Sequence, residues 1–367
     1  MHNLATKWPF LFGLLKCYNF PMQEVLYRKY RSKTFDEVVG QDHIVNTLEK
    51  SIKDGKLAHA YLFSGGRGLG KTSVARILAE ELGTSPNDLF EIDAASNRGI
   101  DDIRGLRESV RALPFDSKYK VYIIDEVHML TKEAWGALLK TLEEPPSYVI
   151  FILATTDIDK VPDTIVSRCV TFSFKIPTIE VLKKFVAHVA EKEKVKLEDG
   201  SLEIIAIAGD GSFRDTLGIL QKVITASSDK KITEEEVADI TGAPSSVLVN
   251  NFVESIAKED PSSGLQALSE ALSRGSDMMI FARLSISKFR YLLMSRYAKD
   301  KKDIFSDSIS QKDREYLDSL DISKSKTVTS KTLVSLLDSI SRMRGSISKS
   351  LPLEIALFDS IEKANEK

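Results

Sequence analysis

The chain has 367 residues, 43% of them hydrophobic and 28% charged, which is enough for two or three domains with cores of their own and is typical of a soluble, cytoplasmic enzyme. The formal net charge of −2 gives no global basic field, so any contact with DNA must come from a local patch. Two cysteines, Cys17 and Cys169, exclude a disulfide framework and a four-cysteine zinc site, so we expect no zinc.

Residues 8–15 form a short apolar stretch near the start of the chain. The stretch is too short to span a bilayer as a helix, and no signal-peptide cleavage site follows it, so no membrane association is expected. We interpret residues 1–21 as an extension outside the folded domains. It is either a loosely packed arm or translated sequence upstream of a true start at Met22, and we favour the second interpretation.

Residues 65–72 read GGRGLGKT and fit the phosphate-binding pattern G-x-x-x-x-G-K-[ST]. A strand-like apolar run precedes them and a helix-like stretch follows, as the motif requires. Glycines let backbone N–H groups surround an anion, and the helix presents its positive end to the same phosphates. Lys71 then reaches the β- and γ-phosphates, and the Thr72 hydroxyl binds Mg²⁺. The nucleotide-binding residues expected here are Gly65, Gly66, Arg67, Gly68, Leu69, Gly70, Lys71, Thr72 and Ser73.

A second motif, KVYIIDEVH at residues 120–128, is a buried-strand pattern that ends in two carboxylates. Asp125 is expected to bind Mg²⁺, and Glu126 to polarise the water that attacks the γ-phosphate. A strand ending in solvated acids is the alternative, which becomes improbable beside a phosphate-binding loop. The lone His128 has no Cys or His cluster near it, so we expect a structural role for it.

Strands and helices alternate along the first half of the chain, which predicts a parallel sheet with helices on both faces. Ligands should lie at the carboxyl ends of the strands, where Asp125, Glu126, Thr155 and Thr156 fall. The expected strands are 60–63, 89–92, 121–124, 149–154 and 170–174, and the expected helices are 41–53, 72–82, 100–111 and 132–142.

After Pro177 we expect helices only. Their spacing predicts a compact lid and then a helical bundle, with a polar linker at 299–310. Thr233 opens one helix with a capping-box pattern. The expected domains are an ATPase core at 22–176, a helical lid at 177–242 and a helical bundle at 243–367. The expected helices are 180–194, 202–208, 213–227, 247–257, 264–273, 278–298, 329–344 and 352–364.

From about residue 25 onward, the chain resembles the gamma/tau subunits of the bacterial DNA polymerase III clamp loader, in the AAA+ class. The matching segments are LYRKYR (26–31), TFDEVVGQ (34–41), HAYLFSG (59–65), EIDAAS (91–96), IDEVHML (124–130), LLKTLEEPP (138–146), FILATTD (151–157), SRC (167–169) and GSFRD (211–215). The resemblance implies an α/β fold: a P-loop ATPase core with a five-stranded parallel sheet, followed by a helical lid and an all-α collar.

The resemblance also implies roles for residues outside the two motifs. Thr155 would be the first sensor of the γ-phosphate, and Arg214 would be the second, reaching it from the lid. Val38 and Val39 would line the adenine pocket. Arg168 would be an arginine finger, supplied in trans to the ATP of a neighbouring subunit.

Lys140 and Arg98 occupy segments that the family turns toward DNA, where basic residues follow the duplex backbone. For either residue, a solvated surface charge is the other interpretation.

The implied function is an ATPase that opens the sliding clamp and places it on primed DNA, using ATP and Mg²⁺. Such a subunit is part of the DNA-directed DNA polymerase III holoenzyme without being its polymerase. The implied partners are delta, delta prime, further gamma copies, the clamp and primer-template DNA. Many relatives carry a four-cysteine zinc module before the EID strand, but here the gap at 83–89 has no cysteine, and the chain resembles the short gamma form.

Two alternatives are a non-hydrolysing scaffold subunit of the delta prime kind and another AAA+ DNA motor. The intact set of Lys71, Thr72, Asp125 and Glu126 argues against the scaffold. The LLKTLEEPP segment and the helical collar argue against the other motor.

Overall fold

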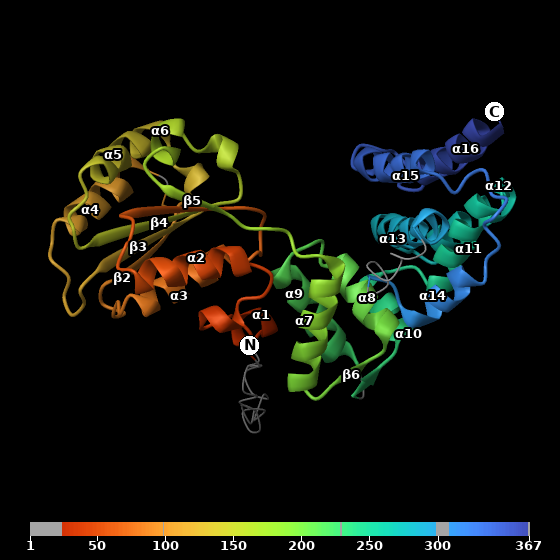
Figure 1. Ribbon diagram of the computed structural model, residues 1–367, viewed down its shortest axis with the longest axis horizontal. Coiled ribbons are helices and arrows are strands. Elements are labelled where there is room, and N and C mark those ends of the chain that lie inside the picture. The colour runs from red at the N-terminus through yellow and green to blue at the C-terminus, as the bar shows by residue number, and fades with distance from the viewer. Residues whose placement is uncertain (1–23, 98, 228–229, 299–307, 366–367) are drawn as a thin grey trace, which may run out of the picture.

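The computed structural model describes residues 24–97, 99–227, 230–298 and 308–365. These residues form an α/β body, a helical lid and a helical collar, in that order along the chain (Figure 1). The predicted extension at 1–21 and Arg98 lie outside the described residues. No helix in the described part of the chain is long and apolar enough to cross a membrane.

The α/β body is built on a five-stranded sheet in which all neighbouring strands are parallel, in the order β2-β3-β4-β1-β5. All five expected strands are confirmed: β1 (Ala60–Ser64), β2 (Leu89–Asp93), β3 (Lys120–Asp125), β4 (Val149–Thr155) and β5 (Val170–Ser173). Ser64 pairs with Thr155, and Asp93 pairs with Asp125, so the carboxyl ends of these strands lie at one edge.

Helices cover both faces of the sheet, as expected (Figure 1). Alternate side chains of β1 point to opposite sides: Tyr61 and Phe63 enter one core, and Ala60 and Leu62 the other. The first core includes α2 (Asp42–Lys53) and α3 (Lys71–Glu81); the second includes α4 (Ile100–Val110), α5 (Lys132–Glu143) and α6 (Asp163–Val166). Three single-turn 3₁₀ helices complete the body: η1 (Phe35–Glu37), η2 (Val127–Met129) and η3 (Ile158–Lys160).

The lid contains α7 (Ile179–Lys192), α8 (Asp199–Ala208), α9 (Phe213–Ala226) and α10 (Glu234–Thr241). The expectation of helices only after Pro177 is wrong in one detail. Two short strands, β6 (Lys196–Leu197) and β7 (Lys231–Ile232), pair in parallel within the lid. A two-residue strand is too short to produce an alternating pattern in the sequence. The predicted capping box at Thr233 is confirmed, with Glu236 as its partner.

The collar is helical throughout its described elements: α11 (Ser246–Ala257), α12 (Pro261–Ser273), α13 (Met278–Tyr297), α14 (Gln311–Asp318), α15 (Ser330–Met343) and α16 (Leu351–Asn365). Helix α14 was not predicted. Residues 299–307 of the expected linker lie outside the described residues, but Ser308, Ile309 and Ser310 are buried rather than solvated.

A short helix before the sheet, α1 (Leu26–Lys29), packs against lid helix α9 rather than against the sheet. Leu26 is 1% exposed and belongs to one continuous apolar core that also contains lid and collar residues. The lid and collar therefore share a core, which is separate from the two cores of the sheet.

Candidate nucleotide-binding site

The phosphate-binding loop connects β1 to α3 at the carboxyl edge of the sheet. Three of its glycines have positive φ: Gly65 (141°), Gly68 (72°) and Gly70 (94°). L-residues rarely adopt these conformations, so the glycines allow the tight path of the loop. A Cβ on Gly65 would also lie 2.8 Å from the carbonyl oxygen of Phe174, which leaves no room for a side chain.

Helix α3 begins at Lys71, and its N-cap, Gly70, provides no side-chain cap. The first N–H groups of the helix are therefore free of side-chain capping and are directed toward the loop, an arrangement that suits a bound phosphate. The Lys71 ammonium donates hydrogen bonds to the carbonyl oxygens of Gly65 and Gly66, each at 2.8 Å. Burial lowers the pKa of Lys71, and the nearby carboxylates of Glu126 and Asp125 oppose that shift.

Thr72 and Asp125 lie together, as the sequence predicts for a Mg²⁺ site. The Thr72 hydroxyl donates to Asp125 Oδ2 at 2.6 Å, and the backbone N–H of Glu126 donates to Oδ1 at 2.9 Å. These two hard oxygens beside a phosphate loop fit Mg²⁺, which usually takes one or two protein ligands together with phosphate oxygens and water. Among the described residues, no group of three or more His, Cys, Asp or Glu forms a separate metal site.

Glu126 follows the end of β3 and has a left-handed backbone conformation, with φ of 48°. Its carboxylate accepts a hydrogen bond from the Thr156 hydroxyl at 2.9 Å, and His128 Nδ1 lies 3.4 Å from the same oxygen. His128 Nδ1 also lies 3.1 Å from the hydroxyl of Thr155. Glu126, His128, Thr155 and Thr156 therefore form one hydrogen-bonded group at the ends of β3 and β4, which sequence reasoning did not predict.

A cavity of about 310 Å³ opens beside the loop, within the size range of small-molecule sites. It brings together most of the predicted nucleotide-binding residues. Those that line it are Val38, Val39, Arg67, Gly68, Leu69, Gly70, Lys71, Thr72, Ser73, Asp125, Glu126 and Arg214. The cavity therefore joins the core, the phosphate loop and the lid.

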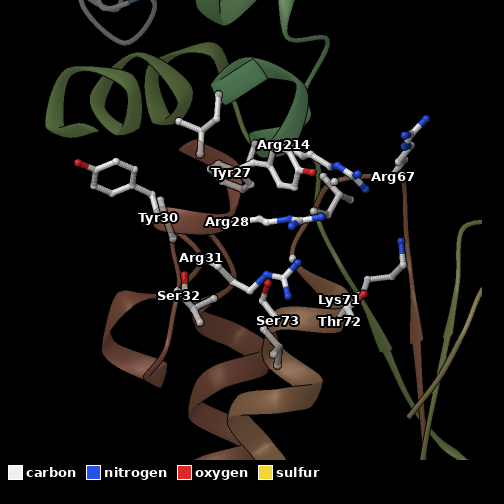
Figure 2. Close-up of a pocket in the computed structure, with 18 of the residues that line it drawn as sticks. Tyr27, Arg28, Tyr30, Arg31, Ser32, Arg67, Lys71, Thr72, Ser73 and Arg214 are labelled. Carbon is white, nitrogen blue, oxygen red and sulfur yellow. The ribbon is translucent and has the colours of Figure 1, made fainter. Parts of the chain in front are cut away.

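Sequence reasoning assigned no role to Tyr27, Arg28 or Arg31, which also line the cavity (Figure 2). They belong to the LYRKYR segment, so the family match was the only sequence signal for them. Burial lowers the pKa of Arg31, and the positive charges of Arg76, Arg214 and Arg28 lower it further. A concentration of cations in one cavity favours a polyanionic ligand such as a polyphosphate.

The lid meets the phosphate loop at the first turn of α9. The backbone N–H of Phe213 donates to the carbonyl oxygen of Gly68 at 3.1 Å. A Cβ on Gly68 would lie 2.0 Å from Ser212 Oγ and 3.2 Å from Arg214 Cβ, so this turn lies directly against the loop. Arg214 projects from it into the cavity region (Figure 2).

The other predicted site residues lie outside the lining of this cavity. Thr155 is fully buried, and its hydroxyl contacts His128 and the backbone of Asp157. Arg168 forms an ion pair with Glu143 at 2.8 Å on its own chain. Lys140 is exposed on α5, and Arg98 is not among the described residues.

Two family models match the chain. The model described as "DNA polymerase III, delta subunit" matches residues 40–97 and 83–178. The model described as "DNA polymerase III clamp loader subunit, ATPase lid domain" matches residues 182–229. The two matches therefore cover the ATPase body and most of the lid.

Curated relatives agree with these models. The chain is 42% identical over 296 residues to the DNA polymerase III subunit tau of Bacillus subtilis, covering 75% of this chain and 52% of that protein. It is 39% identical over 273 residues to the subunit tau of Escherichia coli, covering 69% and 42% respectively. The subunit tau/gamma of Haemophilus influenzae is 44% identical over 240 residues, covering 60% and 35%. The chain thus spans about half the length, or less, of these relatives.

Solved structures of Thermotoga maritima RuvB mutants share the fold. One has a TM-score of 0.50 and 22% identity, covering 75% of this chain and 98% of that chain. Another has a TM-score of 0.50 and 22% identity, covering 68% and 86%. This likeness supports the AAA+ arrangement of core and lid and no more than the fold. With two DNA polymerase III family models and relatives at 39–44% identity, the chain belongs to the gamma/tau family of DNA polymerase III clamp loader subunits.

Proposed function

We propose that this protein is the ATP-driven subunit of a clamp loader, which opens a ring-shaped sliding clamp and places it on primed DNA. The observation that carries the proposal is the complete set of Lys71, Thr72, Asp125 and Glu126 around one cavity, in a chain whose relatives are tau and gamma subunits. A subunit that served only as a scaffold would not need a base next to a metal ligand. The partners we propose are delta, delta prime and further gamma copies, the clamp and primer-template DNA.

ATP binding would use the three parts that meet at the cavity. Val38 and Val39 would hold the adenine, and the N–H groups of the loop would hold the phosphates. Lys71 would move its ammonium from the carbonyl oxygens of Gly65 and Gly66 to the β- and γ-phosphates. Arg214 would reach the γ-phosphate from the lid, so that lid position depends on the nucleotide.

Hydrolysis would depend on the hydrogen-bonded group at the strand ends. Mg²⁺ held by Thr72 and Asp125 would supply positive charge next to the phosphates. Glu126 would accept the proton of the attacking water, and the Thr156 hydroxyl, 2.9 Å away, would orient its carboxylate. Thr155 would sense the γ-phosphate through the same group, which requires a small movement because the residue is fully buried.

Two contacts outside the cavity belong to the assembled complex. Arg168 would leave Glu143 and reach the ATP of a neighbouring subunit as an arginine finger. Lys140 and Arg98 would contact the DNA backbone.

The experiment that tests the proposal is an ATPase assay of the protein assembled with delta and delta prime, with and without sliding clamp and primed DNA. We expect slow turnover alone and a strong increase when clamp and primed DNA are both present. Turnover that is indifferent to clamp and DNA would contradict clamp loading, and absence of turnover under all conditions would support a scaffold role instead.

A further inference from the structure

Helix α1 precedes the sheet in the sequence but is attached to the lid. Leu26 belongs to the same apolar core as Leu217 and Leu220 of α9, and its backbone N–H donates to Gln221 Oε1 of that helix at 3.0 Å. This hydrogen bond and this buried side chain hold α1 against α9, the helix that carries Arg214 in its first turn.

A second set of contacts attaches α1 to the end of α7. The Tyr30 hydroxyl and the Lys29 ammonium both donate to Glu193 Oε1, at 2.5 Å and 2.7 Å. Because α1 contacts both α7 and α9, it is expected to move with the lid when the lid changes its angle to the sheet.

Tyr27 lies on α1 next to Arg214. The Arg214 guanidinium carbon lies 4.8 Å from the centre of the Tyr27 ring, which is within the range of a cation–π interaction. Arg28 lies 5.9 Å from the same ring. Figure 2 shows the ring and the Arg214 side chain close together at the edge of the cavity. In the described part of the chain, no carboxylate forms an ion pair with Arg214, so its charge is available to a phosphate.

The backbone at Arg214 is already held in place. The first turn of α9 lies against the phosphate loop, and the backbone N–H of Phe213 donates to the carbonyl oxygen of Gly68. The remaining freedom of Arg214 lies in its long side chain. An aromatic face beside the guanidinium limits that freedom. Arg28 and Arg214 both lower the pKa of Tyr27, so the hydroxyl also faces these cations, but a guanidinium has five N–H groups and most of them stay available to a phosphate. Aromatic stacking is thus the contact best suited to aim an arginine without neutralising it.

We propose that Tyr27 is a positioning residue for Arg214: its ring holds the guanidinium at the phosphate end of the cavity, so that Arg214 distinguishes ATP from ADP. The inference rests on the proposed function, because recognition of the γ-phosphate by Arg214 is part of that function. Helix α1 precedes the sheet in the sequence, but in this proposal it functions as part of the lid.

The test compares the affinity of the full chain for ADP and for the β,γ-imido analogue of ATP, each with Mg²⁺, by equilibrium titration. The variants are Tyr27→Ala, Tyr27→Leu, Tyr27→Phe, Arg214→Ala and the double variant Tyr27→Ala/Arg214→Ala. Tyr27→Leu retains apolar bulk but lacks the aromatic face, and Tyr27→Phe retains the face but lacks the hydroxyl. Thermal unfolding without nucleotide identifies any variant that does not fold.

We expect Tyr27→Ala and Tyr27→Leu to reduce the preference for the triphosphate about two- to fivefold, the effect of losing one cation–π contact. Tyr27→Phe should keep the preference of the wild type. In the Arg214→Ala background, Tyr27→Ala should cause no further loss of preference, because Tyr27 acts through Arg214.

Three results would overturn the role of Tyr27: equal loss of affinity for both nucleotides, the same loss in Tyr27→Phe as in Tyr27→Ala, or a loss that persists without Arg214. Unchanged preference in Tyr27→Ala, with normal preference in the wild type, overturns this inference alone. A wild-type chain that binds neither nucleotide overturns both this inference and the ATP-dependent part of the proposed function.

Discussion

Lys71 and Glu126 lie on the same cavity, but their contacts indicate different tasks. Lys71→Ala removes the cation of the phosphate loop, so we expect nucleotide affinity to fall about 10- to 100-fold, the effect of losing charge-assisted hydrogen bonds. The amide oxygen of Glu126→Gln can still accept a hydrogen bond from Thr156, but the amide cannot act as a base. We therefore expect normal nucleotide affinity and a turnover about 10²- to 10⁴-fold lower. Nucleotide titration and single-turnover hydrolysis measure the two effects.

The same measurements also contain their own check. If both variants lose affinity to the same extent, the division between binding by Lys71 and proton transfer by Glu126 is wrong. Ser51→Ala is a suitable control, because the Ser51 hydroxyl donates to the backbone carbonyl of Thr47 within α2, away from the cavity, and its loss should leave both quantities unchanged.

The sequence predicted the residues of the site that belong to local motifs, and missed those brought in by tertiary packing. Lys71 and Thr72 are neighbours in one loop whose glycine spacing is fixed by phosphate geometry. The contact between Thr156 and Glu126 joins two strand ends that are 30 positions apart, and no local pattern records such a pair. The roles predicted for Arg168 and Lys140 remain predictions, since both concern partners outside this chain.

At the scale of elements, the contact between the phosphate loop and α9 is tested at Gly68. Gly68→Ala places a Cβ 2.0 Å from Ser212 Oγ in a backbone with φ of 72°, so the loop and the lid must separate. We expect a loss of about 1–3 kcal/mol in unfolding free energy from the strained backbone, together with weaker nucleotide binding. Chemical denaturation and nucleotide titration measure these two losses.

Gly83 offers a matched control for this substitution. It has the same φ of 72°, but a Cβ there would have no neighbour within 4 Å. Gly83→Ala should therefore show the cost of backbone strain without a change in nucleotide affinity. Equal effects of the two substitutions on affinity would mean that the loop–lid contact does not matter for binding.

The elements that the sequence did not predict are short or strongly polar. Helix α14 reads QKDREYLD, with few apolar residues to show a helical period. Its buried side includes Asp313, which is 3% exposed and forms an ion pair with Lys288 at 2.9 Å. A sequence pattern treats such charges as solvated, because burial of a charge depends on a partner that is distant in the chain.

Glu203 of α8 lies at this same junction between lid and collar. Its Oε2 accepts from the backbone N–H of Ser310 at 2.6 Å, while its Oε1 has no hydrogen-bond partner among the residues that the structure describes. Burial raises the pKa of Glu203 to about 7; the charge of Lys288 lowers it and that of Asp313 raises it. Lys183 also lies near this carboxyl and lowers its pKa. Glu234 lines the same small cavity, and burial raises the pKa of Glu234 as well.

This raised pKa predicts how stability depends on pH. Between the ordinary value of 4.5 and about 7, the folded protein holds a proton on Glu203 that the unfolded chain releases. The contribution of Glu203 to stability therefore decreases as pH rises through this window. Glu203→Gln cannot ionise, so it should flatten this part of the profile and be the more stable protein at pH 8. Denaturant midpoints from pH 4.5 to 8 measure this, and a parallel shift of the whole profile would contradict it.

At the scale of the whole molecule, the division of the cores determines which parts move together. Lid and collar share one core that includes Leu26 of α1, whereas the sheet has separate cores on its two faces. Because packed cores resist deformation, we expect a change of nucleotide to rotate the sheet body against the lid and collar as a unit. The connection lies between Phe174 of the sheet core and Ile179 of α7.

Such a rotation would change the position of Arg168 relative to a neighbouring subunit. Arg168 does not line the cavity of its own chain, where it pairs with Glu143. A guanidinium that acts in trans should be dispensable for binding and needed for assembled turnover. We therefore expect Arg168→Ala to retain nucleotide affinity and the slow activity of isolated chains. In complexes with clamp and primed DNA, turnover should fall about 10³-fold or more, the usual contribution of an arginine finger.

Mixed assemblies separate this role from a structural one. A mutant copy should be tolerated only where its finger faces no ATP, while Arg274→Ala, which breaks a surface pair with Glu270 on α12, should have no effect at any position. ATPase rates of isolated chains and of complexes are compared for each variant. If isolated Arg168→Ala chains lose activity to the same extent as complexes, Arg168 acts on the nucleotide of its own chain. Coupling of hydrolysis to assembly would then need another contact between subunits.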